Sequence, residues 1–311
     1  ENLIKVAPKG LSQVHLNNSG AESVEAAIKF ARKFSGKKGM VAMKGSYHGK
    51  SMGALSLTFN PKYRKSFQPL VEKVSFSSYG DIDELRDTVD KDTAFVILEP
   101  IQGESGIHVP SDSFLQDVRK LCDENKILLI FDEIQSGLGR TGSMWAADHW
   151  KTVPDIMCVA KGIAGGVPMG VTLVRPDILS VMKKGEHSST FGGNPLSCAA
   201  GTATIQALTQ DGLIENAKNM GLKFRLGLDE LKDKHRIIRE VRGKGLMIGV
   251  ELKFEVKDIL MEGIKNGLLL LYSGRNILRF LPPLVISEDD IAKTLKILDI
   301  LLTNEETRRN V

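Results

Sequence analysis

The stretch "ILLIFDE" (residues 127–133) decides the fold. Five strongly apolar residues follow one another and end at the carboxylates of Asp132 and Glu133. A short, uninterrupted apolar run is typical of a strand that is buried on both faces of a parallel sheet. In open α/β sheets, ligands bind at the carboxyl ends of such strands. We therefore predict a ligand site beside Asp132.

Further strands and helices alternate along the chain. Apolar runs that predict buried strands occupy residues 39–45, 94–100, 155–161 and 169–176. Helical spacing of apolar side chains occupies residues 21–34 and 113–125. Together these segments predict an α/β fold in which a mostly parallel central sheet is flanked by helices.

The character of the chain changes near residue 208. The segments that follow are a charged amphipathic helix (216–235), a turn and a strand (237–252) and a final helix (288–303). We predict a large domain over residues 1–207 and a smaller C-terminal α+β domain over residues 208–311.

The composition excludes several classes of function. Of the 311 residues, 42% are hydrophobic and 26% are charged, which is ordinary for a soluble globular protein. The net charge of +4 is too small to indicate nucleic-acid binding. No apolar run approaches the ~20 residues that cross a membrane. Cys122, Cys158 and Cys198 form no C-x-x-C pair, and the six histidines lack a metal-ligand spacing. We expect a cytoplasmic protein without a metal site.

Three loops carry candidate ligand contacts, each with a simpler alternative. Ser19 and Glu22 have the S-x-x-E spacing of a capping box, and this helix start is either a phosphate site or a plain N-cap. Tyr47 and His48 lie on a glycine-flanked loop, where they either stack on a flat ring or pack against protein. The carboxylates of "LEPIQGESG" (residues 98–106) either meet a cation or proton, or face solvent.

Asp132 and Lys161 are the strongest pair. Each ends a predicted strand of one sheet, so both side chains could face one crevice. A partly buried carboxylate needs a cationic or hydrogen-bonding partner, and a protonated ring nitrogen would serve. Lys161 alone fits a solvated lysine at a strand end equally well. Together with an aromatic side chain and a helix start, however, these residues describe a site for pyridoxal phosphate, in which the lysine holds the aldehyde as a Schiff base.

A competing motif lies in the same region. "GLGRTG" (residues 137–142) matches G-x-G-x-x-G, the fingerprint of nicotinamide dinucleotide-binding enzymes. That fingerprint follows a strand directly and opens a helix, whereas "DEIQS" intervenes here and "SMWAADHW" is a poor helix start. An NAD-dependent oxidoreductase is therefore the less favoured alternative.

The sequence as a whole resembles the class III aminotransferases of fold type I. The resemblance rests on stretches that run in the family's order along nearly the whole chain: "NSGAESVEAAIK", "YHGKSMGALS", "EPIQGESG", "FDEIQSGLGRTG", "AKGIAGGVPMG", "HSSTFGGNPLSCAA", "VRGKGLMIGVEL" and "LRFLPPLVI". Two further stretches, "LLYSGRNILRFLPPLVI" and "EVKDILMEGI", resemble the acetylornithine branch, and within it the enzymes that act on an amino-group carrier protein in lysine and arginine biosynthesis.

The resemblance implies a role for particular residues. Lys161 would bind the cofactor and shuttle a proton, Asp132 would pair with the ring nitrogen, and Gln135 would lie near the phenolic oxygen. The other implied cofactor contacts are Ser19, Gly20 and Ala21 at the phosphate, Tyr47 and His48 at the ring, and Ser189 and Thr190, which the family takes from the neighbouring subunit of a homodimer. Tyr47 stands where the family more often has Phe.

Two residues would set specificity. Arg279 matches the arginine that grips the α-carboxylate of glutamate or 2-oxoglutarate, and Glu104 matches the carboxylate that pairs with it when the other substrate enters. The implied reaction moves an amino group between glutamate and the terminal aldehyde of an N-blocked semialdehyde. That substrate would be linked to an acidic carrier protein. N-acetylornithine, ornithine and 4-aminobutyrate are the alternatives.

The beginning of the chain departs from the family pattern. The family has a longer segment before "NSG", part of which walls the substrate pocket, whereas 18 residues precede Ser19 here. We expect that this segment is missing from the sequence, which also keeps open a protein that binds the cofactor without catalysis.

Overall fold

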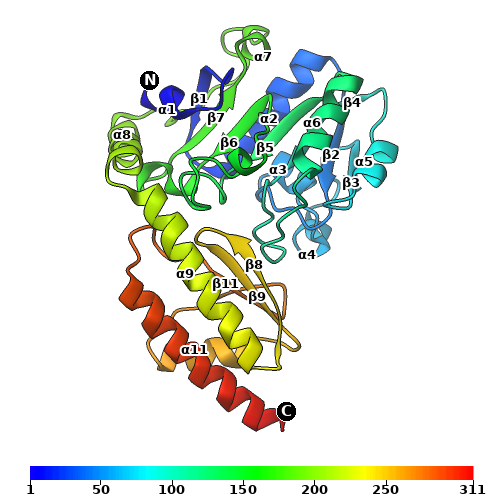
Figure 1. Ribbon diagram of the computed structural model, residues 1–311. Helices are drawn as coiled ribbons and strands as arrows, with labels where there is room; N and C mark the ends of the chain where they lie inside the picture. The colour runs from blue at the N-terminus through cyan, green and yellow to red at the C-terminus, as the bar shows by residue number, and fades with distance from the viewer. Residues whose placement is uncertain (311) are drawn as a thin grey trace.

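The computed structural model describes residues 1–310, and these residues form two β-sheets covered by helices (Figure 1). The strands of the larger sheet are β1 (Gln13–Asn17), β2 (Gly39–Met43), β3 (Val74–Ser77), β4 (Thr93–Leu98), β5 (Leu128–Asp132), β6 (Ile156–Val159) and β7 (Gly170–Val174). They lie in the order β1-β7-β6-β5-β4-β2-β3. The strands from β3 to β6 pair in parallel, whereas β7 and β1 are antiparallel to their neighbours. This confirms the predicted α/β class with a mostly parallel sheet.

Helices cover both faces of the larger sheet. They are α1 (Asn2–Val6), α2 (Gly20–Ser35), α3 (Met52–Leu57), α4 (Pro61–Arg64), α5 (Ile82–Thr88), α6 (Phe114–Asn125), α7 (Pro176–Ser180) and α8 (Pro195–Gln210). Successive side chains of a strand point to opposite faces. Ile130 of β5 therefore packs with the apolar side of α2, while Leu129 and Phe131 pack with that of α6. Burial on both faces explains why the central strands are continuously apolar.

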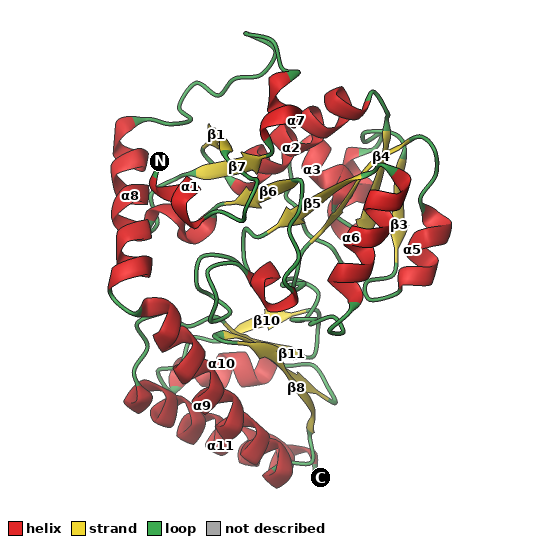
Figure 2. Ribbon diagram, turned by 45° about the horizontal axis from the view of Figure 1, so that its top comes forward, coloured by secondary structure: helices red, strands yellow, loops and turns green. Residues whose placement is uncertain are grey.

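The smaller sheet is antiparallel and lies beside three helices (Figure 2). Its strands are β8 (Ile238–Lys244), β9 (Met247–Leu252), β10 (Leu271–Ser273) and β11 (Ile277–Phe280), and its helices are α9 (Leu213–Lys234), α10 (Lys257–Lys265) and α11 (Glu288–Arg309). The predicted single strand in residues 237–252 is wrong, because β8 and β9 form a hairpin there. Gly245 turns the chain at φ 52°, and a Cβ at this position would lie 2.3 Å from the backbone of Thr141. The hairpin can therefore approach the larger sheet's loops only with glycine at this position.

The predicted domain boundary at residues 207/208 falls inside α8. Helix α8 packs against the 3₁₀ helix Lys161–Ala164 between β6 and β7 of the larger sheet, and α9 packs against β8 of the smaller sheet. The division into two domains at this position stays a prediction.

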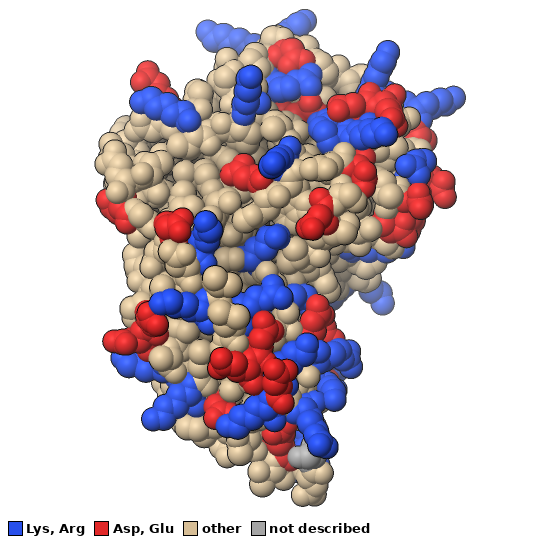
Figure 3. Space-filling view, in the orientation of Figure 1, with Lys and Arg blue, Asp and Glu red and all other residues tan. Residues whose placement is uncertain are grey.

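Charged side chains of both signs are interspersed over the half that contains α9 and α11, whereas few charges cover the surface near α8 (Figure 3). Within residues 1–310, no helix combines the length and apolarity that spanning a bilayer requires.

Glu133, the residue after β5, is fully enclosed and accepts hydrogen bonds from Ser136 Oγ (2.5 Å) and from the N–H of Ala147 (2.8 Å). Burial raises the pKa of its carboxyl to about 7. The folded chain therefore keeps a proton between about pH 4.5 and 7 that the unfolded chain releases, so this group makes folding less favourable as the pH rises through that range.

We expect the free energy of unfolding of wild-type protein, relative to Glu133→Gln, to fall by about 3 kcal/mol between pH 4.5 and pH 7.5. A glutamine retains both hydrogen bonds, because the Ser136 hydroxyl can accept as well as donate. Urea denaturation of cofactor-free protein at several pH values measures the difference. Parallel stability curves for the two proteins would contradict the expected titration of Glu133.

Candidate active site

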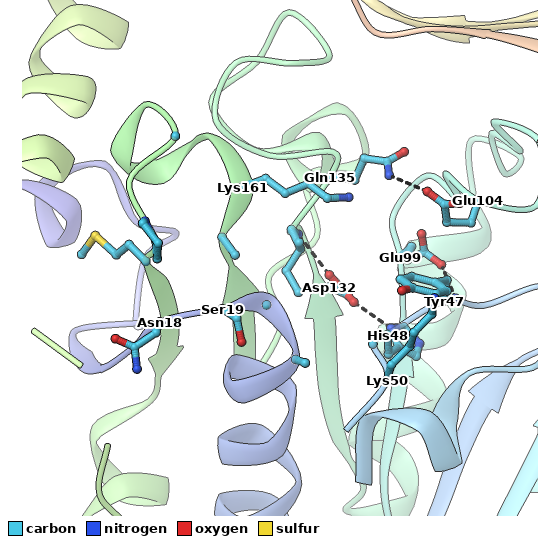
Figure 4. A pocket seen from close by; sticks show the side chains of 18 of the residues that line it. Asn18, Ser19, Tyr47, His48, Lys50, Glu99, Glu104, Asp132, Gln135 and Lys161 are labelled. Atoms are coloured by element: carbon cyan, nitrogen blue, oxygen red, sulfur yellow. Dashed lines mark hydrogen bonds and ion pairs between the residues drawn. The ribbon is translucent and has the colours of Figure 1, made fainter. Parts of the chain in front are cut away.

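A cavity of about 400 Å³ lies at the carboxyl ends of β5 and β6, beside the N-terminus of α2 (Figure 4). Its volume is in the range of cofactor and small-molecule sites. The predicted residues that line it are Ser19, Gly20, Ala21, Tyr47, His48, Glu104, Asp132, Gln135 and Lys161. The chain thus brings together at one sheet edge side chains that are more than a hundred residues apart in sequence.

Lys161 extends into this cavity from the segment that follows β6 (Figure 4). The strand ends at Val159, two residues earlier than predicted, and Lys161 begins a short 3₁₀ helix, Lys161–Ala164, with φ 46°. A left-handed lysine is strained, and such strain is concentrated at functional sites. The Lys161 side chain is accessible from the open cavity, but the surrounding protein partly buries its amine. This burial lowers the pKa of Lys161, and the charges of Asp132 and Glu104 oppose the shift only in part. The amine therefore has an increased neutral, nucleophilic fraction.

Asp132 ends β5 and is 4% exposed. Its Oδ2 lies 2.7 Å from Nδ1 of His48, and its Oδ1 accepts a hydrogen bond from the N–H of Ile134 at 3.0 Å. His48 also lines the cavity, and its predicted contact with a ring stays a prediction. In the structure its imidazole holds the Asp132 carboxylate. This pairing joins residues 84 apart in the chain, so no local sequence pattern indicates it.

The start of α2 is an N-cap with free donors. Ser19 Oγ accepts the N–H of Glu22 at 3.2 Å. The predicted capping box is only half formed, since the Glu22 carboxylate accepts from the N–H of Asn18 (2.6 Å) rather than from Ser19. Within residues 1–310, the N–H groups of Gly20 and Ala21 meet no acceptor. Free N–H groups at a helix start bind anions.

The turn after β2 passes close to this helix start. Gly49 has φ 132°, and a Cβ on it would lie 2.9 Å from the Cβ of Ala21. Tyr47, on the same turn, is half-buried against the cavity and makes an edge contact with Tyr63. Burial, and then the charge of Glu104, raise the pKa of the Tyr47 phenol, which therefore stays protonated.

Glu104 connects the cavity with the smaller sheet. Its Oε1 accepts from Arg279 Nη1 at 2.5 Å and from Gln135 Nε2 at 3.3 Å. Burial alone would raise the pKa of Glu104, but the hydrogen bond and charge of Arg279 outweigh it, so that the net pKa is lowered. Arg279 comes from β11 and lines an adjoining cavity of about 670 Å³, which shares Glu104, Gln135 and Lys161 with the first.

Ser189 and Thr190 do not line the cavity of their own chain. Ser189 Oγ accepts from Asn18 Nδ2 at 2.9 Å, and Thr190 is exposed. Asn18 and Lys50 line the cavity although they were not predicted. Both are direct neighbours of predicted motifs, "NSG" and "YHG", and that adjacency was the signal available for them.

The loop with the dinucleotide-like motif has another arrangement. Arg140 donates from Nη1 to the carbonyls of Leu246 and Pro282, so the loop contacts the segments around β9 and β11. The next helix after Gly142 is a 3₁₀ helix, Ala146–Trp150, and no helix opens at the last glycine as a dinucleotide site requires.

The donors present fit pyridoxal phosphate. Lys161 would offer an amine to its aldehyde, Asp132 would offer a carboxylate to its protonated ring nitrogen, and the unpaired N–H groups of α2 would form a cradle for its phosphate. The fold and this site together define a pyridoxal-phosphate-dependent transferase.

The chain belongs to the class-III aminotransferases, because the family model "Aminotransferase class-III" matches residues 1–302. It is an aminotransferase that uses pyridoxal phosphate. The alternative of an NAD-dependent oxidoreductase was therefore wrong.

Named relatives are similar over most of the chain. An acetylornithine aminotransferase from Caldanaerobacter subterraneus subsp. tengcongensis is 44% identical over 298 residues, which cover 94% of this chain and 76% of the relative. A "[LysW]-aminoadipate semialdehyde/glutamate semialdehyde transaminase" from Sulfolobus acidocaldarius is 40% identical over 296 residues, which cover 95% and 76%. An ornithine aminotransferase from Toxoplasma gondii, with partial occupancy of PLP at its active site, superposes with a TM-score of 0.92 at 34% identity and covers 96% of this chain and 74% of its own.

Proposed function

We propose that this aminotransferase moves an amino group between glutamate and the terminal aldehyde of an N-blocked semialdehyde, bound to an acidic amino-group carrier protein, in lysine or arginine biosynthesis. The ion pair between Glu104 and Arg279, next to Lys161, is the observation that carries the proposal.

A carboxylate-capped arginine suits two dissimilar substrates. When glutamate or 2-oxoglutarate enters, its α-carboxylate replaces Glu104 on the planar guanidinium. When the semialdehyde or its ω-amine enters, Glu104 stays on Arg279 and neutralises it, so that the reacting end of this substrate meets no uncompensated charge. One site thereby accepts both partners of a ping-pong reaction.

Residues of the chain then transfer the proton of the substrate carbon and keep the ring nitrogen protonated. When bound, pyridoxal phosphate supplies an electron sink that stabilises the carbanion formed next to the substrate nitrogen. Lys161, whose pKa is lowered by burial, takes the proton from the substrate carbon and returns it on the opposite side of the reacting nitrogen. Asp132, held by His48, keeps the ring nitrogen protonated.

The remaining contacts hold the cofactor in place. We assign the phosphate to Ser19, Gly20 and Ala21, one ring face to Tyr47, and the phenolic oxygen to Gln135. Ser189 and Thr190 of a second copy would complete the phosphate site.

A homodimer accounts for that second copy. Phe191 is 71% exposed and Leu196, on α8, is 70% exposed. Large apolar side chains on a surface with few charges are typical of a protein interface (Figure 3). We also propose a cytoplasmic location, in keeping with the free thiols of Cys122, Cys158 and Cys198.

The mouth of the site supports the carrier-linked substrate. A further cavity of about 800 Å³ shares Glu104 and Arg279 with the site. It is lined by the exposed cation Lys62 and by Arg275, which is paired with Glu255 at 2.8 Å. Positive charge around an entrance attracts an acidic carrier. The name of the Sulfolobus relative favours the same substrate class, whereas that of the Caldanaerobacter relative favours free N-acetylornithine.

Steady-state kinetics with N-acetylornithine and with carrier-linked lysine and ornithine test the proposal. We expect kcat/KM at least roughly tenfold higher for the linked amines, and an advantage that shrinks as salt screens the mouth. Comparable kcat/KM values for free and linked amines would instead assign the free small molecule.

Lys62→Glu provides a matched variant at the mouth, since Arg275 is already paired with Glu255. The substitution should lower kcat/KM for the linked amines and leave the half-reaction with glutamate unchanged, because Lys62 lines neither of the two cavities that contain Lys161. Equal losses with both substrates would show that the change acts on the fold and not on recognition.

A further inference from the structure

Glu99 directly follows β4 and lies between two functional turns (Figure 4). One turn, after β2, carries Tyr47 and His48 at the wall of the cofactor cavity. The other, after β4, carries Glu104 at the substrate arginine. Glu99 is 5% exposed, and none of the roles assigned above uses it.

The Glu99 carboxylate spans both turns with its two oxygens. Oε1 accepts the N–H of Tyr47 at 3.1 Å, and Oε2 accepts the N–H of Gly103 at 3.0 Å. The N–H donors belong to backbone that has no strand partner at these positions, so the carboxylate replaces the pairing that a sheet would provide.

The surroundings keep Glu99 itself in place. Tyr79 Oη donates to the carbonyls of Glu99 (3.1 Å) and Pro100 (2.8 Å). Gln102 adds a second connection between the turns, because its Nε2 donates to the carbonyl of Lys44 at 3.0 Å. From the smaller sheet, Arg242 Nε donates to the carbonyl of Gly106 at 2.8 Å. The backbone around Glu104 is therefore held at both ends.

We propose that Glu99 is a positioning residue that ties the Tyr47 turn to the Glu104 turn, so that Glu104 swings away from Arg279 on a backbone that does not move. The inference rests on the proposed function for the exchange at Arg279, but the tie itself is a property of the protein without substrate. Its consequence is that the ring wall and the substrate carboxylate keep one relative geometry in both half-reactions.

The chemistry of the contact makes the proposal specific. Two N–H donors need two acceptor oxygens, and only a carboxylate offers them at this spacing. Glutamine has the same shape but presents one oxygen and one NH₂ group, so one turn loses its partner. Aspartate keeps the charge but is one methylene shorter, so it reaches at most one turn.

Amide hydrogen exchange on the cofactor-free protein tests the tie directly. In Glu99→Gln, measured above pH 7 where the Glu99 carboxyl of the wild type is ionised, we expect the segments 45–49 and 102–106 to exchange roughly tenfold faster, the effect of one lost hydrogen bond to a charged group. Glu133→Gln is the matched control, because Glu133 is also a fully buried glutamate after a central strand with a pKa raised to about 7, yet it contacts neither turn. Unchanged exchange in Glu99→Gln, or equal acceleration in both variants, would overturn the proposal.

Kinetics with the holoenzyme give the second readout. Glu99→Gln should raise KM for glutamate roughly tenfold with a smaller change in kcat, and Glu99→Asp should not restore it. If Glu99→Asp had the wild-type KM, the negative charge at this position would matter and the simultaneous contact with both turns would not. That result would overturn the proposal. If carrier-linked and free amines prove equivalent, the substrate assignment fails while the exchange result still decides the role of Glu99.

Discussion

Replacement of Lys161 by alanine is expected to abolish covalent attachment of pyridoxal phosphate and to lower kcat by roughly 10⁴-fold, the upper range for a positioned acid–base group. The Lys161 amine extends into the cavity, and its pKa is lowered. The other lysine that lines the cavity is Lys50, which lies on the turn after β2. Absorbance spectra with added cofactor measure attachment, and single turnover with glutamate measures the proton transfer. If the absorbance of the imine between protein and cofactor persisted in Lys161→Ala, Lys161 would not be the residue that binds the cofactor covalently.

Lys151 supplies a control for backbone strain. It too is a left-handed lysine, with φ 51°, and it does not line the cavity. Lys151→Ala should change stability about as much as Lys161→Ala while leaving the cofactor spectrum and kcat as in the wild type. Lys161→Arg completes the set, since it keeps a positive charge but removes the nucleophile.

Replacement of Asp132 by asparagine is expected to lower kcat by roughly a thousandfold, because losing one preorganised charge at the reacting centre raises the activation free energy by about 4 kcal/mol. An amide neither neutralises a protonated ring nitrogen nor keeps the same pairing with His48. Stopped-flow measurement of the glutamate half-reaction gives the rate, and the equilibrium affinity for the cofactor should fall as well.

Asp155→Asn is the matched comparison for Asp132. Asp155 is also 4% exposed and next to a central strand, but it pairs with Arg119 and Arg175 away from the cavity. We expect this variant to lose stability and to retain the rate of the half-reaction. If Asp132→Asn kept the wild-type rate, another residue would have to compensate the ring nitrogen.

The central strands were predictable because burial on both faces makes them continuously apolar. The edge strands β1 and β3 were not, since "QVHLN" and "VSFS" mix polar and apolar residues as one-sided or edge strands do. The helix start at Ser19 was predictable from its spacing, whereas the partner of Glu22 was not, because that choice depends on how β1 enters the helix.

Some contacts of the candidate site were likewise predictable from the sequence, and others were not. Asp132 and Lys161 follow from the rule that strand ends meet at one edge of a parallel sheet. The contacts between His48 and Asp132 and between Glu99 and the two turns depend on the order of strands in the sheet, which no local pattern specifies. The pairing of Glu104 with Arg279 was expected from the resemblance alone, and its geometry needed both sheets.

The position of Arg279 has a consequence for how such enzymes diversify. The residues that face the cofactor cavity come from residues 18–169, whereas the arginine is carried by β11 of the other sheet. Under the proposed function, mutations that shift or replace this strand would alter which substrate carboxylate Arg279 binds without changing the residues that line the cofactor cavity. Natural selection could therefore change the substrate preference through substitutions near β11, while the part of the gene that encodes the cofactor site stays the same.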